Sequence, residues 1–111
     1  MKYGLTSETM TVITDAISDI STIETVLLYG ARAKGNYRNG SDIDITLLGQ
    51  ALTLDNSVYP LMDKLDDSYL PYTFDISIFE QIDNKDLIEN IKRLGEIFYM
   101  KSKMPCDISE N

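Results

Sequence analysis

Two aspartates, Asp42 and Asp44, lie two residues apart in a stretch that alternates polar and branched apolar side chains. In an extended strand, residues i and i+2 share a face, with Cα atoms about 6.5–7 Å apart. Parallel carboxylates at this separation can bind two divalent cations about 3.5–4 Å apart, whereas without cations they repel each other. For an isolated pair, a solvent-exposed strand edge is the more common explanation, so the neighbouring residues decide the interpretation.

A third aspartate, Asp75, lies in the middle of residues 73–77, which again alternate polar and apolar side chains. Taken alone, it is an ordinary solvated strand residue. If its strand neighbours the strand of Asp42 and Asp44, however, Asp75 completes a three-carboxylate site for hard cations, which prefer oxygen ligands. Two acidic strands that face one site are harder to explain by solvation alone.

A glycine and a cluster of basic residues precede these acids. Gly30 ends the apolar run at residues 25–29 and is followed by good helix formers, so free backbone N–H groups at a helix start can meet an anion. Arg32, Lys34 and Arg38 are three of the ten basic residues and fall within seven positions. The alternative is a strand that ends on glycine, followed by a surface helix with basic side chains.

Together, the anion site, the basic cluster and the acids indicate phosphoryl or nucleotidyl transfer, in which metal ions neutralise triphosphate charge and the protein positions the reactants. The segment starts like a P-loop, but Asn36 and Tyr37 stand where that motif requires Lys and Ser or Thr. A Walker-type NTPase is therefore not expected.

Composition excludes other chemistry. The 111 residues include no His and one Cys, Cys106, which excludes Ser-His-Asp and Cys-His catalysis, imidazole-bound metals and an internal disulfide. We expect a reducing, cytoplasmic location, and no apolar run is long enough for export or a membrane span. The formal charge of −8 argues against binding long nucleic acid and favours a small substrate or a protein partner.

Hydrophobic periodicity predicts strands that alternate with helices, in one domain over residues 1–100 followed by a loose polar tail at 101–111. This order indicates an α/β (α+β) fold with a single small mixed or parallel sheet covered by helices. The predicted strands are residues 25–29, 41–48, 73–78 and 97–100, and the predicted helices are residues 7–20, a short segment after Gly30, 54–65 and 84–94.

The helix boundaries are predicted from capping and breaking residues. Ser7 is expected to cap the first helix, and Asp83 or Asn84 the last. Pro60 should start or bend the third helix. Gly95 is expected to end the last helix in the left-handed conformation. An Asn39-Gly40 turn should precede the second strand.

The sequence resembles the minimal nucleotidyltransferase family of the DNA polymerase β-like superfamily. The residues that carry this resemblance are 28–35, 41–44, Asp75 and 89–95. The family signature is Gly-Ser, ten residues and Asp-x-Asp, followed by a third aspartate on a later strand. Here ten residues, from Arg32 to Ser41, separate Ala31 from Asp42. The resemblance covers most of residues 10–100.

The resemblance implies a nucleotidyltransferase fold in which Asp42 and Asp44 bind two Mg²⁺ ions and Asp75 is the third ligand and a proton acceptor. It also implies that ATP is the nucleotide donor, held along the segment after the first strand. The residues predicted to bind it are Gly30, Ala31, Arg32, Lys34, Arg38 and Ser41.

The chain departs from the family pattern at Ala31, where serine is expected. The backbone N–H remains, but the hydroxyl contact to phosphate is lost, which removes about 1 kcal/mol or somewhat more of nucleotide binding. We therefore expect nucleotide binding to be weakened rather than abolished.

The resemblance also implies a partner. Family members of this size are commonly encoded beside a HEPN-domain toxin and act as antitoxins that transfer AMP from ATP to a tyrosine of that toxin. The acidic charge suits a basic toxin surface, although solubility alone also explains it. Two alternatives remain: an antitoxin that neutralises its partner by complex formation alone, and a small-molecule, antibiotic-type nucleotidyltransferase.

Overall fold

The computed structural model describes residues 3–38 and 40–101. Of the tail predicted at 101–111, residues 102–111 lie outside this range, as does Asn39 of the predicted turn. In chain order the elements are α1 (Ser7–Ser18), β1 (Thr25–Tyr29), α2 (Ala31–Lys34), β2 (Ile43–Leu48), the π-helix η1 (Leu54–Val58), α3 (Tyr59–Asp67), β3 (Phe74–Ile78), the 3₁₀ helix η2 (Phe79–Gln81), α4 (Lys85–Leu94) and β4 (Glu96–Met100).

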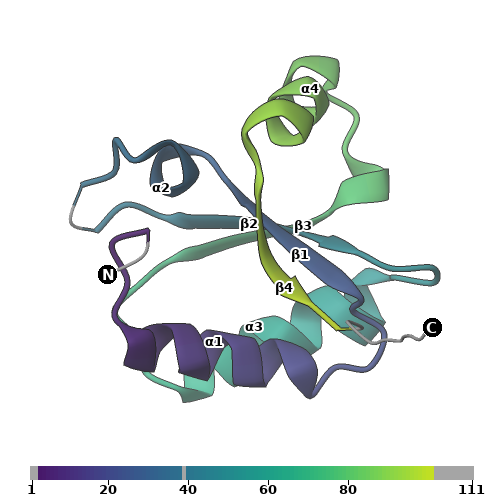
Figure 1. Cartoon of the computed structure of the whole chain (residues 1–111). Helices are drawn as coiled ribbons and strands as arrows, with labels where there is room; N and C mark the ends of the chain where they lie inside the picture. The colour runs from purple at the N-terminus through teal and green to yellow at the C-terminus, as the bar shows by residue number, and fades with distance from the viewer. Residues whose placement is uncertain (1–2, 39, 102–111) are drawn as a thin grey trace, which may run out of the picture.

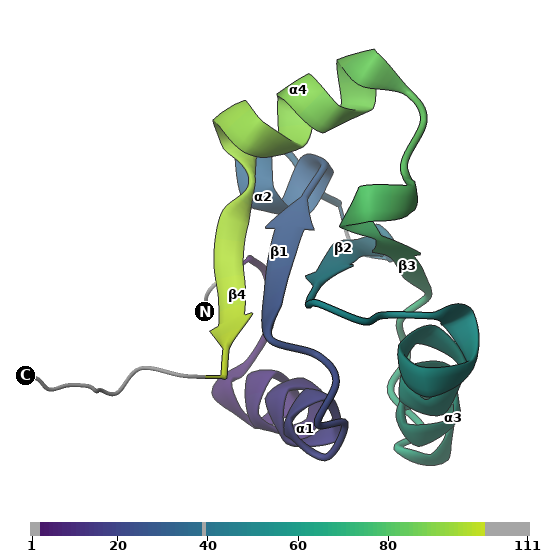
Figure 2. The ribbon, with the colours of Figure 1, turned by 90° about the vertical axis from the view of Figure 1, so that its right-hand side faces the viewer.

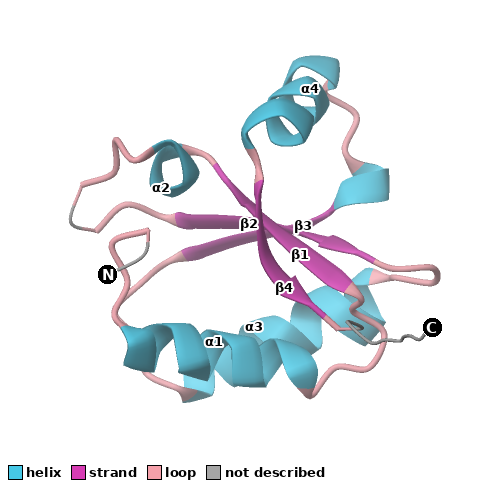
Figure 3. Ribbon diagram, in the orientation of Figure 1, coloured by secondary structure: helices cyan, strands magenta, loops and turns pink. Residues whose placement is uncertain are grey.

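The four strands form one mixed sheet in the order β3-β2-β1-β4 (Figure 3). Strand β1 lies between β2 and β4 and is antiparallel to both, whereas β2 and β3 are parallel. The connection from β2 to β3 contains α3, as a parallel pair requires. The α/β (α+β) fold with a single mixed sheet and packed helices is therefore confirmed.

Helices α1 and α3 lie together on one side of the sheet, and α2 and α4 lie on the other side (Figures 1 and 2). The main core is between the sheet and the α1–α3 layer, because alternate residues of β1 and β2 turn their apolar side chains toward those helices. The fully buried apolar residues are Leu5, Ile13, Ile17, Ile23, Val26, Leu28, Ile43, Ile45, Leu47, Leu61 and, at 1%, Ile91.

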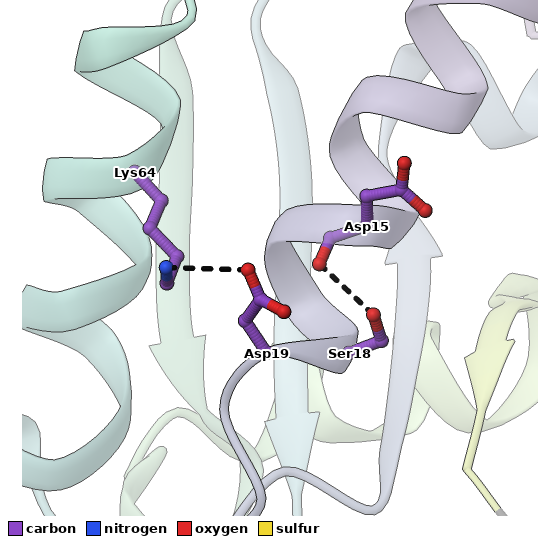
Figure 4. A network of polar contacts seen from close by, with 4 residues as sticks. All are labelled: Asp15, Ser18, Asp19 and Lys64. Atoms are coloured by element: carbon purple, nitrogen blue, oxygen red, sulfur yellow. Dashed lines mark hydrogen bonds and ion pairs between the residues drawn. The ribbon is translucent and has the colours of Figure 1, made fainter.

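An exposed ion pair joins the two helices of this layer at their surface. The Nζ of Lys64 on α3 lies 3.3 Å from Oδ2 of Asp19, the residue that ends α1 (Figure 4). The residue before Asp19 is Ser18, whose hydroxyl donates to the carbonyl oxygen of Asp15, one turn back along the helix, at 2.9 Å. Both side chains of the ion pair are exposed, so the pair contributes about 0.2–1 kcal/mol to the free energy of unfolding. The apolar core is therefore what holds the helices in place.

The first helix begins at Ser7 but ends at Ser18 rather than residue 20, and its capping residue differs from the predicted one. Thr6, not Ser7, is the N-cap, since the Thr6 hydroxyl oxygen accepts a hydrogen bond from the N–H of Thr9 at 3.1 Å. At the other end of the chain, Asn84 rather than Asp83 caps α4, and its Oδ1 accepts from the N–H of Leu87 at 3.1 Å.

The prediction for Gly95 is wrong in its conformation. Gly95 has φ −68° and ψ 146°, which is extended, because the chain passes from α4 directly into β4. A Cβ at this position would collide with the carbonyl oxygen of Ile91. Close approach of two backbone segments therefore explains the glycine, without any left-handed turn.

The third helix begins near Pro60, as predicted, but a π-helical turn extends it toward the N-terminus. Thr53 and Asn56 form a reciprocal capping box on η1, and Pro60 lies in the first turn of α3. The predicted apolar face is wrong at two positions, because Leu54 and Met62 are each 43% exposed.

Candidate functional site

Asp44 and Asp75 lie side by side on the sheet. The parallel register of β2 and β3 pairs Asp44 with Asp75, and paired residues of neighbouring strands project from the same face. Ile43 and Ile45, which flank Asp44, are fully buried on the opposite face. The expectation that the two acidic strands are neighbours is therefore confirmed.

The electrostatics show that these carboxylates are crowded together. Partial burial raises the pKa of Asp44 above its ordinary value, and the negative charges of Asp75 and then Asp42 raise this pKa further. Asp42 therefore also lies close enough to act on Asp44. Like charges held this close are unfavourable unless a cation or a proton compensates them.

The raised pKa of Asp44 has a predictable effect on stability. Because the folded-state pKa lies above the unfolded value of about 3.9, stability falls as pH rises through the interval between these two values. In metal-free buffer at about pH 7 we therefore expect Asp44→Asn to raise the free energy of unfolding, and this gain to disappear at about pH 3, where the carboxyl is protonated in both states. Urea midpoints at both pH values measure the effect.

The exposed α3 residue Asp63 provides the matched control, and Asp63→Asn should leave both midpoints almost unchanged. Equal midpoints for Asp44→Asn and the unsubstituted chain at about pH 7 would contradict the assigned crowding.

The predicted three-carboxylate cage is not closed. In residues 3–38 and 40–101, no three aspartate or glutamate side chains are gathered closely enough to hold a metal ion as they stand. Asp42 precedes β2, which begins at Ile43, so strand pairing does not fix its position as it fixes Asp44 and Asp75. The donor chemistry still suits a hard divalent cation, since the crowded groups offer carboxylate oxygens.

Gly30 lies directly against Asp44. It connects β1 to α2 with φ 77° and ψ −155°, a backbone conformation that is essentially restricted to glycine. A Cβ at Gly30 would collide with Oδ2 of Asp44, and the preceding residue, Tyr29, pairs with Asp44 across β1 and β2. The predicted anion-binding turn and the acidic strand are therefore adjacent.

The other residues predicted to bind nucleotide surround this turn. Ala31 begins α2 and is partly buried, whereas Lys34 and Arg38 are exposed. Ser41 stabilises the loop that returns to β2, because its hydroxyl oxygen accepts a hydrogen bond from the N–H of Arg38 at 2.7 Å.

Arg32, which was also predicted to bind nucleotide, has its side chain buried beneath the turn. Arg32 is only 3% exposed. Its Nε and Nη2 donate to the carbonyl oxygen of Ser41 at 3.1 and 3.0 Å, and its Nη1 donates to the carbonyl oxygen of Tyr3 at 2.8 Å. The guanidinium therefore holds backbone carbonyls.

Sequence reasoning missed three hydroxyl groups on the acidic face of the sheet. The hydroxyl of Ser77 donates to Oγ1 of Thr46 at 2.9 Å and is also hydrogen-bonded to Tyr29. Burial raises the pKa of Tyr29, the bond to Ser77 lowers it, and the charges of Asp75 and Asp44 raise it. The strand alternation that placed the aspartates also places Thr46 and Ser77 on this face.

Two further findings bear on the type of site. A cavity of about 550 Å³ lies at the opposite end of β1, where Thr25 and Lys101 line it, away from the aspartates. In the part of the chain that the structure describes, no helix has both the length and the apolar character needed to cross a membrane.

The sequence matches known nucleotidyltransferases. The model of the family described as polymerase beta, nucleotidyltransferase, matches residues 12–104. A protein of Methanocaldococcus jannaschii, whose name assigns it provisionally to the protein adenylyltransferases, is 38% identical over an alignment of 96 residues, with a coverage of 77% of this chain and 71% of the relative.

Solved structures share the fold. A toxin–antitoxin structure with AMP-PNP has a TM-score of 0.67 at 20% identity, covering 82% of this chain and 73% of that chain. A mutant of the toxin–antitoxin pair MntA–HpeT has a TM-score of 0.59 at 16% identity, covering 85% and 71%. A protein of Sulfolobus solfataricus, provisionally named a nucleotidyltransferase, has a TM-score of 0.53 at 18% identity, covering 83% and 77%.

Proposed function

Because the chain belongs to the polymerase β nucleotidyltransferase family, we propose that it is a Mg²⁺-dependent antitoxin that transfers AMP from ATP to a tyrosine of a partner HEPN toxin. Its relative is provisionally named a protein adenylyltransferase, which supports AMP as the transferred group. The fold neighbours come from toxin–antitoxin structures, one of them with AMP-PNP, which supports a toxin partner and an adenine nucleotide.

The observation that carries this proposal is the contact between the two halves of the site. The register of β2 and β3 places Asp44 beside Asp75, and Gly30 leaves no space for a side chain between the turn and Asp44. A triphosphate bound at the turn would therefore meet the carboxylates directly. Lys34 and Arg38 are exposed on the same segment and supply positive charge for the phosphates.

The reaction is a displacement at the α-phosphorus of ATP. The tyrosine hydroxyl oxygen forms a new bond to this phosphorus, the bond to the bridging oxygen breaks, and pyrophosphate leaves with the electron pair. Asp75 is assigned as the acceptor of the hydroxyl proton. Mg²⁺ held by Asp42, Asp44 and Asp75 would neutralise triphosphate charge and lower the pKa of the attacking hydroxyl.

The acidic surface supports a basic partner. The formal charge of −8 favours fast association with a positively charged toxin, and this attraction weakens as salt screens it. The toxin would contribute the tyrosine, and this chain would supply the nucleotide and the carboxylates.

The test is an AMP-transfer assay with the purified chain, its co-encoded toxin and Mg²⁺. Label from ATP that carries ³²P at the α position should appear on the toxin, whereas label at the γ position should not, and excess EDTA should stop the transfer. Mass spectrometry then identifies the modified residue. Toxin neutralisation without any transferred label would favour the binding-only antitoxin, and label on a small molecule would favour the antibiotic-type enzyme.

Restoring the family serine should improve nucleotide binding. Ala31→Ser adds a hydroxyl donor at the start of α2, beside Gly30, which is expected to lower the Kd for ATP about fivefold, equivalent to about 1 kcal/mol. Isothermal titration with a non-hydrolysable ATP analogue measures the change. Ala33→Ser, on the same short helix, is the matched control, and an equal gain in both variants would contradict a specific contact at position 31.

A further inference from the structure

Arg32 connects the anion-binding turn to the acidic strand through the backbone. We propose that Arg32 is a positioning residue, which fixes the peptide that carries Asp42 and does not itself bind phosphate. This inference rests on the proposed function, because it assigns Asp42 to the working site. If Arg32 bound phosphate, its substitution would weaken ATP binding. A positioning role instead predicts that the substitution lowers the turnover rate.

The hydrogen bonds of the guanidinium give the first reason. Both Nε and Nη2 donate to the same oxygen, the carbonyl of Ser41, at 3.1 and 3.0 Å. This carbonyl belongs to the peptide whose nitrogen is that of Asp42. A planar guanidinium can make this forked contact, whereas a lysine ammonium cannot reproduce its geometry.

The surroundings of the guanidinium give the second reason. Its carbon lies 5.3 Å from the ring centroid of Tyr37 and 5.1 Å from that of Tyr72, and Nη1 is bonded to the carbonyl oxygen of Tyr3. Two aromatic faces and three carbonyl bonds compensate the cost of burying the charge. No carboxylate of the described residues forms an ion pair with Arg32, and its burial leaves it inaccessible to a triphosphate.

The strand pattern gives the third reason, because Asp42 lies outside the backbone pairing of the sheet. Sheet pairing begins one residue later, where the N–H of Ile43 donates to the carbonyl oxygen of Thr73 at 2.9 Å. Asp44 and Asp75 are therefore fixed by register. The peptide that joins Ser41 to Asp42 is instead held at its carbonyl oxygen by Arg32, while the amide and hydroxyl of Ser41 are bonded to the backbone of Arg38. The N-terminal segment lies beside the loop that precedes β2 (Figure 1), and the Tyr3 contact ties this segment to the same arginine.

Arg32→Lys is the test, since it keeps the charge and removes the fork. In the protein without nucleotide, hydrogen exchange of the Ser41 and Asp42 amides should accelerate at least about tenfold while the core of β1 and β2 keeps its protection. In the AMP-transfer assay, kcat should fall at least about tenfold and the KM for ATP should change less than about threefold.

Arg93→Lys on α4 is the matched control, because Arg93 is exposed and neither measurement should change. A higher KM with unchanged kcat would assign phosphate binding to Arg32 and overturn the inference. Unchanged exchange at Asp42 in folded Arg32→Lys would overturn it whether or not the unsubstituted chain transfers AMP. Absence of transfer by the unsubstituted chain, with faster exchange at Asp42 in the variant, would instead overturn the proposed function alone.

If Arg32→Lys does not fold, Tyr37→Leu replaces it in the exchange measurement. Tyr37 is 37% exposed, so the substitution disturbs the core little while removing one aromatic face from the guanidinium. Exchange at Asp42 should then accelerate by a smaller factor of about threefold, and no acceleration would count against the inference.

Discussion

Replacing Asp42 and Asp44 together with asparagine is expected to reduce AMP transfer at least about a thousandfold and to leave the fold intact. Asparagine keeps the shape of each side chain but removes the charge with which carboxylates bind a cation. The strands remain paired, because the β2 ladder uses backbone groups and the apolar side chains of Ile43, Ile45 and Leu47. Initial rates of label transfer, with circular dichroism on the same preparations, measure both effects.

The matched control is Asp63→Asn with Asp67→Asn, two exposed acids of α3. This control makes the same change in net charge and should keep the rate within about twofold. Label that persists in the Asp42 and Asp44 variant would refute the catalytic assignment of these carboxylates. If that variant transfers no AMP but still suppresses the toxin fully, complex formation accounts for neutralisation.

The elements that depend on local pattern could be predicted from sequence with good accuracy. The apolar, β-branched run at residues 25–29 is found as β1 with those bounds, and the alternation predicted at 73–78 is found as β3, which begins one residue later at Phe74. The first segment is marked by its continuous apolar run and by the glycine after it, and the second by its alternation of polar and apolar residues, so no distant contact is needed to predict either strand.

Other features depend on contacts between distant segments. Arg32 looked like a surface base on a short helix, and nothing near it in the sequence shows that Tyr3 and Tyr72 would surround it. Gly95 looked like a left-handed helix end, but the path of β4 makes it extended. Local propensity gives no information on such tertiary contacts.

The candidate site was predictable only in part, because some of its features follow from local pattern and others from distant contacts. Strand alternation placed Asp44 and Asp75 on the polar faces of their strands. Only the sheet order β3-β2-β1-β4 shows that these strands are neighbours. Asp42 lies just outside the ladder, so alternation predicted its face without predicting what fixes it. The contact between Gly30 and Asp44 joins β1 to β2 and was not visible from either segment alone.

Gly30→Ala is expected to reduce AMP transfer about a hundredfold. The substitution has two separate costs: φ at Gly30 is +77°, which costs an L-residue about 1–2 kcal/mol, and the new Cβ would collide with Oδ2 of Asp44. Relief of the collision requires movement of either the carboxylate or the turn. A displacement of about 1 Å between reacting groups can cost about a hundredfold in rate.

Gly35→Ala separates these two costs. Gly35 ends α2 with φ +90°, but a Cβ there would meet no atom within 4 Å. Gly35→Ala should therefore lose about 1–2 kcal/mol in the free energy of unfolding from backbone strain, and Gly30→Ala at least as much, because its ψ of −155° lies outside the left-handed helical region. Only Gly30→Ala should lose most of its activity. Equal losses of activity in the two variants would mean that backbone strain makes glycine necessary at position 30, and that the contact with Asp44 does not. The adjacency of the turn and the carboxylate would then no longer explain the need for glycine.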